Sequence, residues 1–148
     1  MQLMTTLKPD VEKSSSLIER SGLKVLALRR GYVKCLMPLE ANRSHEGTLP
    51  TGALFMLVEA SGKAIFLSSF NTSRFQVFLK HTELKMEQAA ESEVTLEVQL
   101  KETVISQVTT KVDITGRGDY VLEGVLRDED DGVVAKFQAG YQVTPVKQ

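Results

Sequence analysis

The sequence has a single cysteine, Cys35, so the chain cannot form an internal disulfide. It also lacks an excess of basic residues, because 18 lysines and arginines oppose 19 acidic residues and leave a net charge of -1. Recognition of nucleic acid needs a concentrated positive surface, so we expect no nucleic-acid partner. No stretch approaches the roughly 20 apolar residues that span a bilayer, and no basic segment followed by an apolar run predicts a secretory signal. We therefore expect a cytoplasmic protein with no membrane partner.

Several well-known chemical motifs are missing as well. The two histidines, His45 and His81, match no zinc-ligand spacing with Cys35. The sequence contains no Gly-x-Ser-x-Gly nucleophile elbow and no phosphate-binding loop. We therefore expect no metal and no resident cofactor.

The chain does contain segments of clear helix or strand character, and its 148 residues suit one domain over 1–148. Pro9–Arg20 predicts a short helix that ends at Ser21-Gly22. Leu23–Leu28 and Tyr32–Leu36 are rich in strand formers and are separated by a short turn, so they predict a hairpin.

The segment Gly52–Phe70 has a different pattern. Gly52–Val58 is apolar on every face of a helix, and Ala60 and Ala64–Leu67 continue the pattern. A helix that is apolar all round is buried all round, so we expect a buried helix over about 50–68. Pro50 and Thr51 suit its first turn, where proline is tolerated and threonine can cap.

The remainder is mostly strand. Alternating apolar residues predict strands over Phe75–Met86, around Val94–Leu100, over Tyr120–Arg127 and over Val133–Val143. The alternation slips near Lys80-His81, which indicates a bulge. Val104, Ile105, Val108 and Val112 fall at helical spacing, with Gly116 as a candidate C-cap. A single long apolar helix is the economical cover for the dry face of such a sheet.

This order of elements resembles the hotdog superfamily, and the similarity is greatest to small acyl-CoA thioesterases of the phenylacetyl-CoA thioesterase kind. The resemblance is carried by His45-Glu-Gly-Thr48 and by Gly52-Ala-Leu-Phe-Met-Leu-Val-Glu59, because that family places an acid seven residues after a glycine. It implies an α+β hotdog fold, an antiparallel sheet wrapped around a long central helix. Pro50, Ser44 and Thr51 stand where the family has His, Asn and the first Gly.

The residues themselves predict a reaction centre at Glu59. A carboxylate within an apolar helix suits a general base or nucleophile for a thioester, and the Gly52 N–H at the helix start suits a developing oxyanion. His45, in the preceding loop, is the second catalytic candidate. The candidate substrate-binding residues are Ser44, Thr51, Asn42 and Ser61.

Three functions remain open. The first is hydrolysis of an acyl-CoA or acyl-carrier thioester, with coenzyme A only as part of the substrate. The second is a non-catalytic acyl- or CoA-binding protein, and the third is a hotdog enoyl-CoA hydratase or dehydratase that uses His45 and Glu59. Because the family is dimeric or tetrameric and open strand edges favour pairing, we expect at least a homodimer with the site at the subunit interface.

Overall fold

The computed structural model describes residues 4–147, so residues 1–3 and 148 of the predicted domain range 1–148 lie outside the described residues. The elements are α1 (Met4–Glu12), α2 (Ser16–Ser21), β1 (Lys24–Arg29), β2 (Tyr32–Met37), the 3-10 helix η1 (Glu40–Asn42), α3 (Thr51–Ser69), β3 (Phe75–Met86), β4 (Val94–Gln99), α4 (Glu102–Thr115), β5 (Gly118–Arg127) and β6 (Val133–Pro145).

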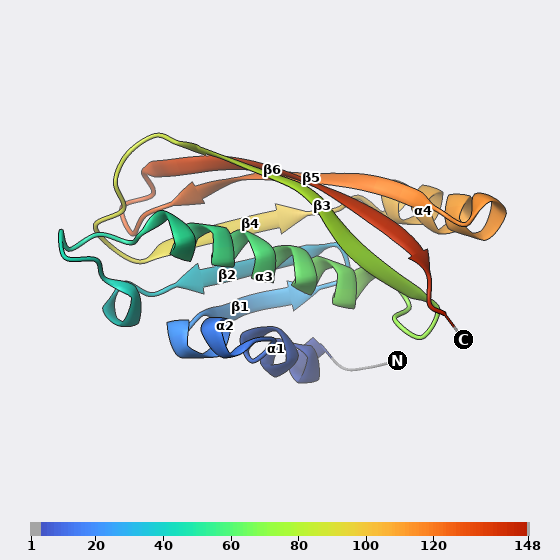
Figure 1. Cartoon of the computed structure of the whole chain (residues 1–148), viewed down its shortest axis with the longest axis horizontal. Helices are drawn as coiled ribbons and strands as arrows, with labels where there is room; N and C mark the ends of the chain where they lie inside the picture. The colour runs from blue at the N-terminus through green and yellow to red at the C-terminus, as the bar shows by residue number, and fades with distance from the viewer. Residues whose placement is uncertain (1–3, 148) are drawn as a thin grey trace.

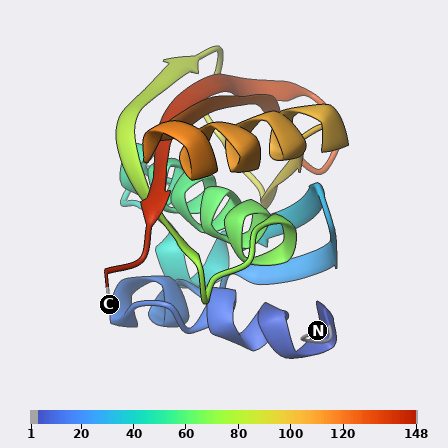
Figure 2. The same ribbon diagram turned by 90° about the vertical axis from the view of Figure 1, so that its right-hand side faces the viewer.

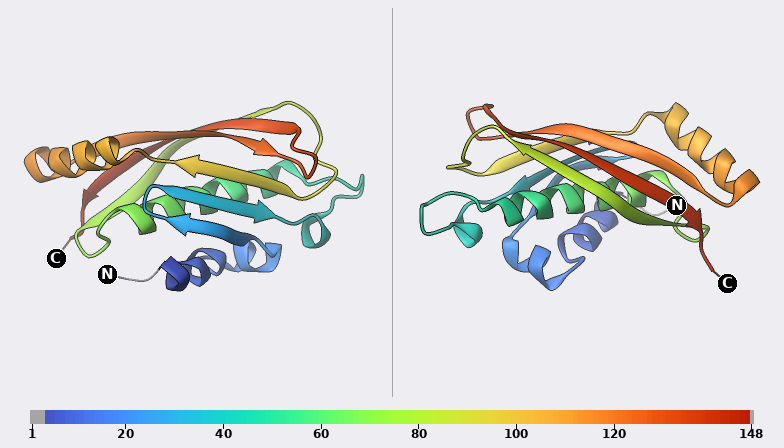
Figure 3. Two further views of the ribbon diagram at one scale, coloured as in Figure 1. Left: turned by 180° about the vertical axis from the view of Figure 1, so that it is seen from behind. Right: turned by 45° about the horizontal axis from the view of Figure 1, so that its top comes forward.

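The six strands form one antiparallel sheet in the order β1-β2-β4-β5-β6-β3. Figure 2 shows this sheet curling around α3, with α1 and α2 on the far side of the helix. From behind, in the left view of Figure 3, β1, β2 and β4 cover α3. This arrangement is the predicted hotdog fold, an antiparallel sheet wrapped around a long central helix.

The two edges of the sheet differ. On β1, the Val25 N–H donates to the Glu12 carboxylate at 2.8 Å, so α1 covers part of that edge. The other edge is β3, which pairs on one side only, with β6. An uncovered edge of 12 residues offers its backbone groups to another strand.

Local sequence signals account for two further features. The register of β3 against β6 shifts between Leu79 and His81, which confirms the predicted bulge. Helix α4 ends where Gly116 takes a left-handed conformation, so the predicted helix and its C-cap are also confirmed.

The single helix predicted over Pro9–Arg20 is wrong, because the structure has two helices there. Helix α1 ends at Glu12, and Ser15 then caps α2 by accepting a hydrogen bond from the Ile18 N–H at 3.1 Å. A serine side chain competes with the backbone for hydrogen bonds, so a serine run favours a restart over a continuous helix. The predicted end at Ser21-Gly22 is confirmed.

Helix α3 is not buried all round, contrary to the prediction. One stripe along it, formed by Gly52, Phe55, Met56, Glu59, Lys63 and Leu67, is exposed or only partly buried. These positions recur every three or four residues and so share one face. In Figure 1 no other element lies in front of the first turns of α3, whereas strand β3 passes beside its last turns.

By length and composition, α3 passes the test for a membrane span, and it is the one helix among residues 4–147 that does. The expectation that no stretch approaches that length is therefore corrected. Most of α3 is buried against the sheet, and buried core helices pass the same test, so the match is weak evidence for a span.

The β1–β2 turn yields a stability prediction. Gly31 has φ +74°, and a Cβ there would lie 2.6 Å from the Leu100 carbonyl oxygen. Gly47 has φ +82° but open space around it. We expect Gly47→Ala to lower the free energy of unfolding by about 1 kcal/mol and Gly31→Ala to lower it by about 3 kcal/mol. Both substitutions strain a left-handed residue, but only Gly31→Ala must also displace the backbone at Leu100. Urea unfolding measures both; equal losses would show that the contact with Leu100 is unimportant.

Candidate active site

A pocket of about 390 Å³ lies between the exposed side of α3 and the sheet strands β3 and β6. The residues that line the pocket are far apart in the sequence. Most of them belong to α3 and β3, and Tyr141 belongs to β6. The aliphatic and phenyl side chains of the lining are Phe66, Leu67, Phe75, Val77, Leu79 and Val146. Such a volume falls within the range of small-molecule sites.

Polar groups in the lining are few. They are Glu59 and Lys63 from α3, Thr72 from the following loop, Gln76 from β3 and the hydroxyl-bearing Tyr141. Glu59 is exposed and forms no hydrogen bond or ion pair with any other residue between 4 and 147. An apolar pocket with one unpaired carboxylate suits a ligand that is mostly apolar and reacts at one end.

The side of the pocket formed by β6 rests on stacked aromatic rings. Tyr141 stacks on Tyr120 with centroids 5.1 Å apart, Tyr120 on Phe70 at 5.6 Å, and Phe70 on Phe66 at 5.4 Å. Stacked rings of this kind hold one another in place. This wall of the pocket is therefore fixed by packing that continues into the core.

Gly52 lies in the first turn of α3, on the same face as Glu59. Apart from its chain neighbours and the nearby backbone of the helix, no described atom lies within 4 Å of where its Cβ would be. Pro50 occupies the N-cap position and makes no side-chain capping hydrogen bond. Thr51 is the first helical residue, so the prediction that Thr51 can cap the helix is wrong. First-turn N–H groups have no partner within the helix. Seven residues at about 1.5 Å each place Gly52 about 10 Å from Glu59 along the axis.

The loop before α3 is held by its own polar side chains. The Asn42 side chain donates to the carbonyls of Ser21 and Pro38, each at 2.8 Å. The Ser44 hydroxyl lies 3.1 Å from that of Thr48 and accepts from the Thr48 N–H. His45 is exposed, and no hydrogen bond joins it to another residue between 4 and 147. None of these loop residues lines the pocket.

Ser61 points the other way, into the core. It is fully buried and faces the Cys35 thiol on β2, away from the pocket. Burial raises the pKa of Cys35 to about 11, and the Ser61 hydroxyl offsets this only in part. The structure therefore places Ser61 with the core of the sheet and not with Glu59.

A reactivity prediction follows for Cys35. Because a thiol attacks as its thiolate and the pKa of Cys35 is about 11, the folded protein should not react with a disulfide reagent at pH 8. The denatured chain should release one equivalent of thiol from the reagent, because Cys35 is its only cysteine. Absorbance of the released thiol measures both. Rapid reaction of the native protein would mean that the thiol is accessible.

Sequence reasoning missed most of the pocket lining. The prediction of a strand over Val133–Val143 gave Tyr141 no role in the site. A signal was present, since a tyrosine hydroxyl on a buried strand face needs a partner. Among residues 4–147, no group of three histidine, cysteine or acidic residues is placed to hold a metal ion.

The fold and the pocket define a hotdog protein with a carboxylate beside a largely apolar cavity of about 390 Å³. No protein-family model and no curated protein matches the chain. A protein of unknown function and probable thioesterase from Pseudomonas aeruginosa, known from its crystal structure, is 36% identical, with a TM-score of 0.93 and 99% of each chain covered. The chain therefore belongs to the hotdog-fold thioesterase superfamily.

More distant structures share the fold alone. A thioesterase from Haemophilus influenzae is 14% identical with a TM-score of 0.75, over 100% of this chain and 94% of that one. A mutant of another Pseudomonas aeruginosa thioesterase is 16% identical with a TM-score of 0.75, over 99% and 96%.

Proposed function

We propose that this protein hydrolyses the thioester of an acyl-CoA or acyl-carrier substrate, with Glu59 as general base or nucleophile. The main support for the proposal is the Glu59 carboxylate, which lines an apolar pocket of about 390 Å³ and has no hydrogen-bond or ion-pair partner among the described residues. The thioesterase name of the 36% identical Pseudomonas aeruginosa protein supports it.

The acyl chain is the part of such a substrate that fits the pocket. Phe66, Leu67, Phe75, Val77 and Leu79 offer apolar surface along its length. Burying apolar surface contributes about 25 cal/mol per Å², so an acyl chain gains affinity there. We propose that the carbonyl end of the bound chain lies beside Glu59, which lines the same pocket.

The reaction needs one proton acceptor and one oxyanion donor. As a base, Glu59 takes a proton from water while the hydroxide adds to the carbonyl carbon; as a nucleophile, its carboxylate adds directly. The tetrahedral oxyanion then collapses and the C–S bond breaks. In the first route, the protonated Glu59 returns its proton to the thiolate and the free acid leaves. In the second route, the thiolate takes a proton from water, and a further water molecule hydrolyses the mixed anhydride to release the acid and restore the Glu59 carboxylate. Backbone N–H groups near the start of α3, including that of Gly52, are suited to stabilising the oxyanion.

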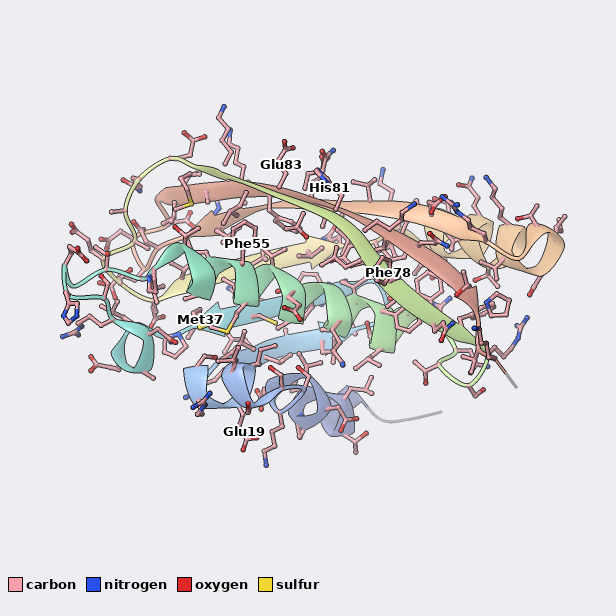
Figure 4. The ribbon with its side chains drawn as sticks, in the orientation of Figure 1. Glu19, Met37, Phe55, Phe78, His81 and Glu83 are labelled. Carbon is pink, nitrogen blue, oxygen red and sulfur yellow. The ribbon has the colours of Figure 1, made fainter. Side chains whose placement is uncertain are left out.

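One chain does not bring these two groups together. Gly52 and Glu59 lie about 10 Å apart along α3, too far to act on one carbonyl. A two-fold axis that sets the exposed stripes of two α3 helices antiparallel brings Gly52 of each protomer toward Glu59 of the other. The uncovered β3 edge and the exposed Phe55 support such pairing with a second copy (Figure 4). We therefore propose a homodimer with two sites at its interface.

Release of free thiol from a panel of acyl-CoA thioesters tests the proposed function. The buried Cys35 should give no background with the thiol reagent. We expect turnover of at least one acyl class. Calorimetric binding of acyl-CoA without turnover would instead select the non-catalytic binding protein, and loss of the ultraviolet enoyl band on water addition would select the hydratase.

A further inference from the structure

The hydroxyl of Tyr141 is a buried polar group with no partner. Tyr141 is 5% exposed, and its Oη forms no hydrogen bond with any residue that the structure describes. Buried polar atoms are almost always bonded, so an exception needs an explanation. The ring is fixed by stacking on Tyr120, which leaves the hydroxyl in a defined place.

That place is against α3, one turn from Glu59. A Cβ at Gly62 would lie 2.0 Å from Tyr141 Oη, so only glycine admits the hydroxyl here. Glu59 and Gly62 are three residues apart and are neighbours on one helix face. Both residues and Tyr141 line the same pocket.

Electrostatics links the two side chains directly. Burial first, and then the charge of Glu59, raise the pKa of Tyr141 to about 12. At neutral pH the phenol is therefore protonated and can donate. Glu59 is an acceptor with no hydrogen-bond partner among residues 4–147. A hydroxyl donor without a hydrogen-bond partner and a carboxylate acceptor without one, among the described residues, thus line the same pocket.

We propose that the Tyr141 hydroxyl donates a hydrogen bond to the Glu59 carboxylate and positions it for the reaction. This positioning role rests on the proposed function of Glu59. Hydrogen bonding from Tyr141 fixes the orientation of the carboxylate and favours its charged form when an acyl chain displaces water from the pocket. Lys63 is the only other charged group in the lining, and the lining residues of β3 are uncharged.

The three tyrosines of this chain allow a test that does not depend on turnover. Tyr32 donates to the Glu97 carboxylate at 2.8 Å and serves as the positive control. Tyr120 is buried without a hydrogen-bond partner among the described residues and is outside the pocket lining, so it is the negative control. Tyrosines labelled with ¹³C at the ring carbon that bears the hydroxyl give one resonance each.

We expect the resonances of Tyr141 and Tyr32 both to shift as pH falls through the range in which carboxylates take up a proton. Glu59→Gln should abolish the shift of Tyr141 and leave that of Tyr32. The Tyr120 resonance should move little in either protein. A Tyr141 resonance that ignores pH, or a shift that survives Glu59→Gln, would overturn the proposal.

Kinetics provides the second test. Tyr141→Phe should lower kcat about tenfold or more, because a hydrogen bond to a charged group is lost. The acidic limb of its pH–rate profile should move to higher pH, since the carboxylate loses a donor that favours its charged form. Tyr120→Phe also removes a buried hydroxyl, but it should leave kcat and the pH–rate profile unchanged.

A purely structural Tyr141 gives a different result. Removing an unsatisfied buried hydroxyl would leave the thermal midpoint unchanged or higher, with the pH profile of the wild type, and this would refute the positioning role. If the wild type hydrolyses no thioester, the proposed function fails, and the resonance experiment still decides whether Tyr141 and Glu59 are bonded.

Discussion

Replacing Glu59 with glutamine is expected to lower the rate of thioester hydrolysis by about 10²–10⁴-fold, the usual contribution of a general base. Glutamine keeps the length of the side chain but can neither accept the proton of the attacking water nor attack the carbonyl as a carboxylate. Because Glu59 is exposed and unpaired among the described residues, the substitution should leave the fold intact. Thiol release measures the rate, and circular dichroism checks the fold.

A matched control comes from β3. Glu83 is exposed on that strand and points away from α3 in Figure 4, so Glu83→Gln removes the same charge outside the pocket. We expect this variant to match the wild type. Equal turnover by Glu59→Gln and the wild type would remove Glu59 from the mechanism.

Replacing Phe55 with arginine is expected to give a folded monomer with hydrolysis reduced by about 10²–10³-fold. Phe55 is 40% exposed on the stripe of α3 that we propose to face a second copy, and an arginine there places charge in an apolar contact. A monomer has no partner to supply oxyanion donors to Glu59, and loss of one such donor costs this much. Light scattering at micromolar concentration measures the mass.

Ile114 provides the control for an exposed apolar residue elsewhere. It is 77% exposed on α4 and lies outside the pocket beside Glu59. Ile114→Arg should remain dimeric and fully active. A wild type that scatters light as a monomer, or a monomeric Phe55→Arg that keeps full activity, would rule out a site shared between two subunits.

Much of the fold follows from local sequence pattern. The central helix was predicted over about 50–68 and extends over Thr51–Ser69, because a long run of apolar residues with no strand alternation admits few other structures. The bulge near His81 followed from a slip in alternation, since one extra residue reverses the side that each later residue faces. These signals lie within single elements and need no knowledge of their neighbours.

Only part of the site could be predicted from the sequence. The spacing from Gly52 to Glu59 located both residues on one helix face, but composition alone suggested that the whole helix is buried. Which stripe remains uncovered depends on where β3 ends the sheet and where α1 packs, and neither is local. Tyr141 comes beside Glu59 because β6 pairs between β5 and β3. The local sequence around Tyr141 or Glu59 does not predict that strand pairing will bring the two residues together.

The most direct test of the central claim is a crystal structure of the protein with a non-hydrolysable thioether analogue of an acyl-CoA. We predict that the acyl chain occupies the pocket between α3 and β3, against Phe66 and Leu79. The atom that replaces the carbonyl carbon should then lie within reach of Glu59 of one protomer and the N-terminal turn of α3 in its partner. An acyl chain bound elsewhere, with Glu59 far from the sulfur, would contradict the account.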